Sequence, residues 1–466
     1  MTLFHDLDYF HGFIDVKECK VLLKDPGDFL LRHQFSHSVK SREFECIISV
    51  ADDARLRTVG IHKSKKSNNF SYQGSHDKYP SVKAIVDHFM STKKPIIDNV
   101  QLLKPIMRQS WELLNSQVVI LSPEVQLGKG SFGTVLRGKL VGKDVDVAIK
   151  RLNESAAEGQ YADALQEARI MRSFDHKNLI KIHGVVIESI PIMLVIELIE
   201  GNSMSKMLKE NLIPPNYRVS LVCGLFNGLC HVHERGYIHR DVAARNVLLS
   251  HDCRDIKLID FGLSRPGPSY DIQTPQKIPT KWLAPEVCHQ QKFSYKSDVW
   301  AFGITVWEIY NDGAEPYPTK KNAEVRALLK DENLFNEVKP DFNNVMGQEK
   351  PPQELINAMA SVFDFNVVTR ISMDLLRPLL ERGVFDKMNV PPFDNAKVMQ
   401  QKGQQHVAEK TPALHSSARV ISPVRSLTGI GKQLTPSRQR KGKKPGSLKP
   451  WAGGKKEKTS RRKNKQ

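Results

Sequence analysis

The stretch His239-Arg240-Asp241-Val242-Ala243-Ala244-Arg245-Asn246 decides how the rest of this 466-residue chain is interpreted. It supplies a carboxylate that can accept the proton of a substrate hydroxyl and, five residues later, an amide that can bind Mg²⁺. A second stretch, Asp260-Phe261-Gly262, follows Asp241 by 19 residues, behind an apolar run at residues 256–259. Its aspartate is suited to a metal that bridges two phosphates. The two stretches together predict a site for a metal-bound polyphosphate.

A glycine-rich turn lies upstream, between two runs of strand-forming residues. Missing side chains in such a turn let backbone N–H groups lie close over phosphates. Strand, turn and strand follow one another without a long helix directly after the turn, which argues against a dinucleotide-binding turn. Alone, the turn is equally compatible with an ordinary β-turn. Its residues are Leu127, Gly128, Lys129, Gly130, Ser131, Phe132, Gly133, Thr134 and Val135.

A lysine and a glutamate extend the pattern. Val147-Ala148-Ile149-Lys150 is typical of a strand, and Glu167 stands 17 residues later on a predicted helix. The lysine can contact the α- and β-phosphates while the glutamate holds it, because a lone flexible ammonium samples many unproductive rotamers. Taken singly, they would be an exposed strand lysine and a solvated helix residue. With Ala284-Pro285-Glu286 further along, five elements stand in order and favour one common site.

On these five elements, residues 118–388 resemble the catalytic domain of eukaryotic protein kinases. The resemblance implies a bilobal fold that binds ATP with Mg²⁺ or Mn²⁺. It makes Asp241 the proton acceptor and Lys150 and Glu167 the phosphate-positioning pair. Metal ligands are then Asn246 and Asp260, and the further nucleotide contacts are Ala148, the gatekeeper Ile196, the hinge residues Glu197 and Ile199, and Leu248. It also makes Arg370 the expected partner of Glu286.

Two details favour a tyrosine kinase over a serine/threonine kinase. Serine/threonine kinases usually carry a lysine two residues after the catalytic aspartate, whereas this chain has Ala243 there and the catalytic-loop residue Arg245 two positions later. Residues 278–282 resemble the tyrosine-kinase substrate platform, and the Ala-Ala-Arg order resembles that of the Fes/Fer group and receptor kinases more than that of the Src group. We therefore expect γ-phosphoryl transfer to tyrosine in protein substrates. Tyr270 is the expected regulatory phosphosite, with an unregulated loop tyrosine as the alternative.

Residues 9–97 form a smaller predicted α+β module with an arginine, Arg32, at the end of a buried run. A guanidinium offers phosphate two parallel charge-assisted hydrogen bonds. With a helix predicted at residues 82–90, the module resembles an SH2 domain that binds phosphotyrosine proteins through Arg32, Ser36 and Ser38. The chain departs from that family, since His33-Gln34 follows the arginine in place of Glu-Ser. A buried ion pair is the alternative role of Arg32.

Most of the formal net charge of +18 lies in the last 70 residues. Residues 397–466 hold 19 lysines and arginines and two glutamates, so the rest of the chain is nearly neutral. Low apolar content predicts a disordered tail. Its basic clusters suit anionic lipids of the inner membrane face. Because Trp451 is the one aromatic residue of the segment 397–466, sequence-specific nucleic-acid binding is not expected. A merely solvating tail is the alternative.

The sequence therefore predicts an α+β chain of four parts: an SH2-like domain (9–97), a linker (98–117), a bilobal kinase domain (118–388) and a disordered basic tail (389–466). Six scattered cysteines and the lack of an apolar run of about 18 residues indicate a cytoplasmic protein, and the basic tail would place it peripherally at the inner face of the plasma membrane. The main functional alternative is a catalytically weak scaffold that uses the SH2-like module and tail. A nucleic-acid-binding protein is a third.

Overall fold

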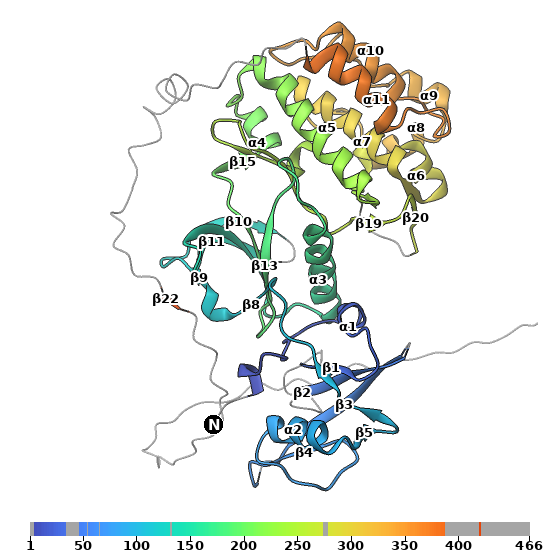
Figure 1. Ribbon diagram of the computed structural model, residues 1–466. Coiled ribbons are helices and arrows are strands. Elements are labelled where there is room, and N and C mark those ends of the chain that lie inside the picture. The colour runs from blue at the N-terminus through green and yellow to red at the C-terminus, as the bar shows by residue number, and fades with distance from the viewer. Residues whose placement is uncertain are drawn as a thin grey trace, which may run out of the picture. The chain divides into compact units, whose positions relative to one another are not determined.

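The computed structural model describes residues 4–33, 46–53, 55–64, 66–130, 133–273, 278–386 and 419–420. A β-rich N-terminal region precedes a larger region with a mainly β part and a mainly helical part (Figure 1). Four predicted site residues lie outside the described residues, namely Ser36, Ser38, Ser131 and Phe132. The predicted tail also lies outside them, except for residues 419–420.

The N-terminal region is built on a five-stranded sheet in the order β4-β3-β2-β1-β7. Both faces of β1 are buried, because a helix packs on each side. Phe29 and Leu31 share a core with Ile85 of one helix, while Leu30 shares another with Cys19 of the other. The strands are β1 (Asp28–Arg32), β2 (Cys46–Asp52), β3 (Arg55–Lys63), β4 (Phe70–Tyr72) and β7 (Lys104–Pro105), with β5 (Pro95–Ile97) and β6 (Val100–Gln101) in a separate hairpin.

The two helices of this region begin at polar caps. Asp15 accepts a hydrogen bond from the backbone N–H of Glu18 at the start of α1 (Val16–Leu22), 2.6 Å. Ser81 does the same for Ala84 at the start of α2 (Val82–Thr92). The helix predicted at residues 82–90 is therefore confirmed and extends two residues further.

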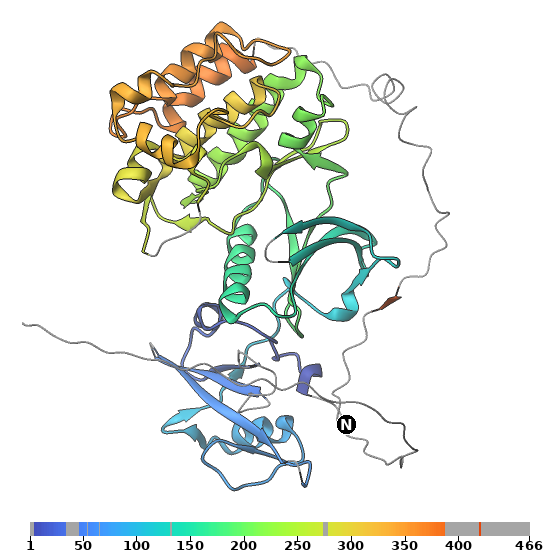
Figure 2. The same cartoon turned by 180° about the vertical axis from the view of Figure 1, so that it is seen from behind.

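A curved sheet with one long helix beside it follows (Figures 1 and 2). The glycine-rich turn joins β10 to β11 in an antiparallel pair, and Lys150 on β12 lies between Val135 of β11 and Leu194 of β14. The helix is α3 (Glu158–Arg172), and the strands are β8 (Glu112–Leu113), β9 (Val118–Ile120), β10 (Gln126–Gly130), β11 (Gly133–Leu140), β12 (Val145–Leu152), β13 (Ile182–Val186) and β14 (Met193–Glu197).

The helical part surrounds α5 (Arg218–Glu234) and α7 (Tyr295–Tyr310), which lie side by side. Most residues of both helices are buried, which agrees with apolar side chains around much of their circumference. This part also contains small sheets, formed by β15 (Gly201–Ser203), β17 (Val247–Ser250) and β18 (Ile256–Leu258), by β16 (Tyr237–Ile238) with β19 (Arg265–Pro266), and by β20 (Ser269–Asp271) with β21 (Lys292–Ser294). The other helices are α4 (Met204–Lys209), α6 (Pro285–Gln290), α8 (Asn322–Leu328), α9 (Glu332–Asn336), α10 (Gln353–Val362) and α11 (Met373–Leu380).

The predicted polar connector carries short strands. β7 runs parallel to β1, and β8 runs parallel to β13. The segment between β7 and β8 therefore connects the N-terminal sheet to the larger sheet. Leu102 and Leu113 of this segment are buried, which a purely polar connector would not require. At the other end of the chain, β22 (Arg419–Val420) pairs antiparallel with β9. Within the residues that the structure describes, no helix has the length and apolar character needed to cross a bilayer.

Candidate functional site

The loop that carries Asp241 is fixed by one buried aspartate of α7. Asp298 accepts hydrogen bonds from the backbone N–H groups of His239, at 2.7 Å, and Arg240, at 2.9 Å. Arg240 has φ +70°, a left-handed conformation that costs a non-glycine residue on the order of 1 kcal/mol. The two hydrogen bonds offset this cost, so α7 sets the path of the loop.

Both carboxylate oxygens of Asp241 have partners. The side-chain amide of Asn246 donates to Oδ2 at 2.7 Å, and the guanidinium of Arg245 donates to Oδ1. Arg245 also lies over the ring of Trp282, 4.4 Å from its centroid. Three of the predicted residues thus meet at one point, and the carboxylate has one defined orientation.

Lys150 and Glu167 form a close pair between β12 and α3. The lysine Nζ lies 2.8 Å from Oε1 and 2.7 Å from Oε2 of the glutamate, whose side chain is buried. Burial alone would lower the pKa of Lys150, but the carboxylates of Glu167 and Asp260 outweigh it and raise the pKa above the ordinary value. The lysine is therefore charged and aimed by its partner.

Asn246 precedes β17 and Asp260 follows β18. Because these two strands are antiparallel, both residues lie at the same end of the pair. Val247 of β17 pairs with Leu258 of β18, and the backbone N–H of Ile259 donates to the carbonyl of Asn246 at 2.9 Å. Asp260 has φ +65°, which turns the chain directly after β18. One carboxylate and one amide oxygen near a charged lysine are hard donors of the kind that Mg²⁺ prefers, so these residues fit a metal-bound triphosphate.

Two glycines of the glycine-rich turn differ in what an added side chain would contact. A Cβ on Gly130 would meet no atom within 4 Å, whereas a Cβ on Gly133 would stand 2.1 Å from the carbonyl oxygen of Arg151. Gly133 is therefore required by close packing against β12, whereas the space beside Gly130 is open among the described residues. The neighbouring predicted contacts lie on the same hairpin: Leu127, Gly128 and Lys129 on β10 and Thr134 and Val135 on β11.

The predicted adenine-contacting residues line the strands behind this hairpin. Ala148 of β12 pairs with Ile196 of β14. The side chain of Glu197 is engaged elsewhere, since its Oε1 accepts from the backbone N–H of Lys181 and the Nζ of Lys257. Ile199 and Leu248 pack on the apolar core of the helical part. The two parts of the region thus meet beside these residues.

Tyr270 lies against two arginines. The guanidinium of Arg240 is 4.5 Å from the Tyr270 ring centroid and 4.4 Å from that of Phe293, and that of Arg265 is 5.6 Å from Tyr270. Burial lowers the pKa of Arg240 to about 10, and repulsion from Arg265 adds to the effect. Two cations therefore lie close to the ring of the predicted phosphosite.

The predicted partnership of Arg370 and Glu286 is confirmed. The arginine is 1% exposed and donates to both carboxylate oxygens, at 2.7 and 2.9 Å. A bidentate buried pair of this kind joins residues 84 positions apart and fixes the end of the segment that starts at Asp260.

Arg32 ends β1 in the N-terminal region, with 6% of its surface exposed. Its Nε donates to the hydroxyl of Ser49 on β2 at 2.8 Å, and Thr58 of β3 is the register partner of Ser49. Sequence reasoning missed Ser49, because only the strand register brings it beside the arginine. Its Nη1 donates to the backbone carbonyl of His33 at 3.4 Å, so among the described residues Nη2 is the guanidinium nitrogen that stays available for an anion.

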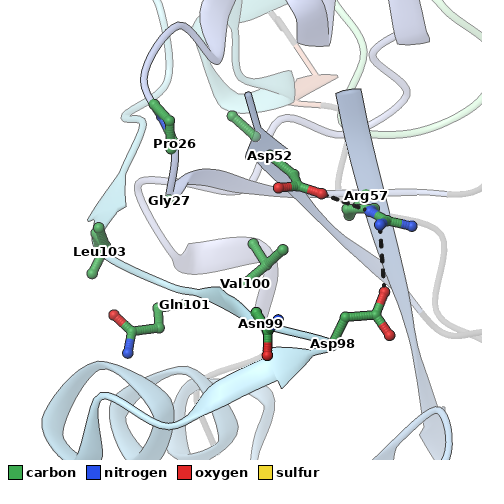
Figure 3. Close-up of a pocket in the computed structure, with 10 residues that line it drawn as sticks. Pro26, Gly27, Asp52, Arg57, Asp98, Asn99, Val100, Gln101 and Leu103 are labelled. Atoms are coloured by element: carbon green, nitrogen blue, oxygen red, sulfur yellow. Dashed lines mark hydrogen bonds and ion pairs between the residues drawn. The ribbon is translucent and has the colours of Figure 1, made fainter. Parts of the chain in front are cut away.

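A cleft of about 310 Å³ lies at the opposite end of β1 from Arg32, beside Gly27 (Figure 3). Arg57 in its wall pairs with Asp52 at 2.8 Å and with Asp98 at 3.5 Å. Because these charges satisfy one another, the cleft has no strong preference for an anion. It is separate from the Arg32 site.

A contact between α1 and α3 was not predicted. Arg169 of α3 lies 2.9 Å from Asp15 and 2.5 Å from Glu18, and Arg172 lies 2.8 Å from the other oxygen of Glu18. Arg172 also stacks on Trp111, 3.7 Å from the ring centroid. The helix that carries Glu167 is thus held from its opposite side by the N-terminal region.

Comparison with known proteins agrees with this geometry. Residues 121–380 match the protein tyrosine and serine/threonine kinase family, and the chain belongs to this family. Within it, the chain is a tyrosine kinase related to Fer and Fps. Membership implies ATP as the phosphoryl donor and proteins as substrates.

Three relatives show how far the similarity extends. Fer-related kinase 1 of Caenorhabditis elegans is 32% identical over 325 residues, covering 69% of this chain and 82% of that protein. Human tyrosine-protein kinase Fer is 34% identical over 325 residues, covering 68% of this chain and 38% of that protein. The transforming protein Fps of avian sarcoma virus (strain PRCII) is 31% identical over 330 residues, covering 69% of this chain and 59% of that protein. The chain thus spans most of the worm relative and less than two thirds of the other two.

Proposed function

We propose that the kinase uses Asp241 as proton acceptor, Lys150 with Glu167 to position the phosphates, and Asn246 with Asp260 to hold Mg²⁺ or Mn²⁺. The observation that carries this proposal is the Lys150–Glu167 pair at 2.7 Å, beside an Asp241 whose two oxygens are both oriented by neighbours. Phosphoryl transfer needs mainly positioning and charge stabilisation, which such pre-set side chains supply.

Each residue then has a defined task. Asp241 accepts the proton of the tyrosine hydroxyl, and Arg245 keeps its carboxylate turned toward that hydroxyl. Lys150 binds phosphate oxygens without a rotamer search, because Glu167 holds it. A metal bound by Asn246 and Asp260 would neutralise charge on the β- and γ-phosphates.

The Arg32 module is proposed to act as an SH2 domain, covering residues 9–97 and joined by a linker to the kinase domain at residue 118. Two observations support this proposal. Arg32 ends the buried strand β1, and its Nε donates a hydrogen bond to the hydroxyl of Ser49 on β2. Binding of phosphotyrosine proteins would bring the kinase to partners already phosphorylated.

Tyr270 is proposed as an activating phosphosite. A phosphate on its ring would lie near Arg240, which belongs to the catalytic loop, and near Arg265. Charge-assisted hydrogen bonds to these arginines would hold β20 and the catalytic loop together.

The basic tail is proposed to place a cytoplasmic kinase at the inner face of the plasma membrane. Nineteen basic residues against two acids in residues 397–466 support attraction to anionic lipids. Sequence-specific nucleic-acid binding is not part of the proposal.

The test is phosphate transfer from ATP to a poly-Glu/Tyr substrate with Mg²⁺, before and after phosphorylation of Tyr270. Asp241→Asn and Lys150→Met are each expected to lower kcat by at least about 100-fold, because one removes the proton acceptor and the other the phosphate contact. Unfolding temperatures of both variants serve as the folding control. No transfer by the phosphorylated wild type would favour the alternative, a scaffold that binds partners without catalysis.

A further inference from the structure

Glu308 is a buried carboxylate that no motif of the sequence pointed to. It lies on α7 and is 3% exposed. Its Oε2 accepts two hydrogen bonds, one from the backbone N–H of Ala244 at 3.0 Å and one from the indole Nε1 of Trp282 at 2.9 Å. Ala244 belongs to the loop of Asp241, and Trp282 belongs to the predicted substrate platform. One oxygen atom therefore bridges two segments that are 38 residues apart in the chain.

Arg245 completes the bridge. It follows Ala244 directly, its guanidinium lies 4.4 Å from the Trp282 ring centroid, and it donates to Asp241. Moving Trp282 would therefore move the surface on which Arg245 rests. Moving Ala244 would shift Arg245 and Asp241 together along the backbone. Both routes from Glu308 end at the carboxylate that accepts the proton.

We propose that Glu308 is a positioning residue for tyrosine phosphorylation, which holds the Asp241 loop and the Trp282 platform in register with each other. The proposal rests on the proposed function and adds a residue to it. Transfer requires the tyrosine hydroxyl, presented by the platform, to meet Asp241 within hydrogen-bond distance. An error of about 1 Å in such an arrangement can cost on the order of 100-fold in rate.

The chemistry of the site favours this role over a purely stabilising one. Burial raises the pKa of Glu308 to about 7, against the two hydrogen bonds and the positive charges of Arg245 and Lys209. Burying a carboxylate costs folding free energy through desolvation, so stability alone gives little reason for an acid at this position. Both hydrogen bonds end on the same oxygen, so an amide carbonyl at this position could accept them too.

The test compares Glu308→Gln with Glu308→Leu, alone and combined with Trp282→Phe. Glutamine keeps a carbonyl acceptor, whereas leucine removes it and leaves both donors unpaired. Activity is measured as kcat and KM for a tyrosine peptide and KM for ATP. Contact with Trp282 is followed separately through its indole signal in ¹⁵N NMR spectra, assigned with Trp282→Phe. Val362→Ala on α10, which packs against α7 at Gly303, is the control for lost stability.

The expected result is a kcat about 10- to 100-fold lower for Glu308→Leu, with a much smaller loss for Glu308→Gln and little change in KM for ATP. Trp282→Phe should lower kcat in the wild-type background and add little to Glu308→Leu. The indole signal should shift in the leucine variant and stay close to wild type in the glutamine variant.

Three results would overturn the proposal. They are equal losses for glutamine and leucine, additive effects of Trp282→Phe, or a kcat for Val362→Ala that falls as far as that of Glu308→Leu at matched stability. A wild type that transfers no phosphate would instead defeat the proposed function. The indole signal would still show whether Glu308 holds Trp282.

Discussion

Among the described residues, Arg32 is the main phosphate-binding side chain of the proposed phosphotyrosine site. Its strand fixes the backbone, and Ser49 uses one of its five N–H donors. On the SH2 resemblance, two positions that often carry further basic side chains correspond to Val16 and Thr58, with Lys17 and Arg57 adjacent to them. Affinity for phosphotyrosine should therefore depend more on this guanidinium than on any other group described.

We predict that Arg32→Lys weakens phosphotyrosine-peptide binding by at least about tenfold, because a lysine cannot form the two parallel bonds of a guanidinium. Arg32→Ala should remove measurable binding, and Ser49→Ala should cost less than either. Calorimetry with one peptide, phosphorylated and unphosphorylated, measures the difference. Equal affinity of wild type and Arg32→Ala for the phosphorylated peptide would show that Arg32 is structural.

Sequence reasoning succeeded for residues whose spacing is set by one segment. Asp241 and Asn246 stand five positions apart in one loop, so their meeting follows from local geometry. Lys150 and Glu167 were found because they belong to the kinase motifs. Ser49 and Glu308 belong to no such motif, and only strand register or helix packing joins them to partners 17 and 64 positions away. A buried glutamate in an apolar helix was the one available signal for Glu308.

Helix α3 forms ion pairs on two different faces. Glu167 points from one of them to Lys150, while Arg169 and Arg172 on the other meet Asp15 and Glu18 of α1. The pairs are partly buried, with Glu18 side-chain exposure of 8%, so water screens them less than surface pairs. The sequence predicted both helices but not their contact, because each charged residue alone is typical of a solvated helix face.

We predict that Glu18→Arg lowers kcat by about threefold to tenfold, because α3 loses a contact worth on the order of 1 kcal/mol and its Glu167 becomes less well fixed. Adding Arg169→Glu should restore part of the activity by forming a reversed pair. Asp87→Arg on α2 makes the same charge change at an exposed pair far from α3 and is the control. Unchanged kcat in Glu18→Arg, or no recovery in the double variant, would show that the contact between α1 and α3 does not affect catalysis.

The net charge of the whole molecule is concentrated in one part of the chain. Residues 397–466 hold a net charge of +17 of the total of +18, so the kinase and the Arg32 module are nearly neutral together. Long-range attraction to an anionic surface must therefore come from the tail. The sequence predicted this division from counting alone, whereas the connector strands β7 and β8 needed the structure, because two-residue strands carry no periodic pattern.

We predict that the full chain binds vesicles containing phosphatidylserine and that deletion from Asn395 removes measurable binding. Each lysine or arginine near such a surface contributes about 1 kcal/mol, so replacing Arg461, Arg462 and Lys463 by glutamine should give an intermediate loss. Raising the salt from about 0.1 to 1 M shortens the Debye length from about 10 to 3 Å and should weaken binding. Neutral vesicles and kinase activity of the deletion variant are the controls. Vesicle binding that survives the deletion would place the membrane contact in the nearly neutral remainder and leave the tail a solvating segment.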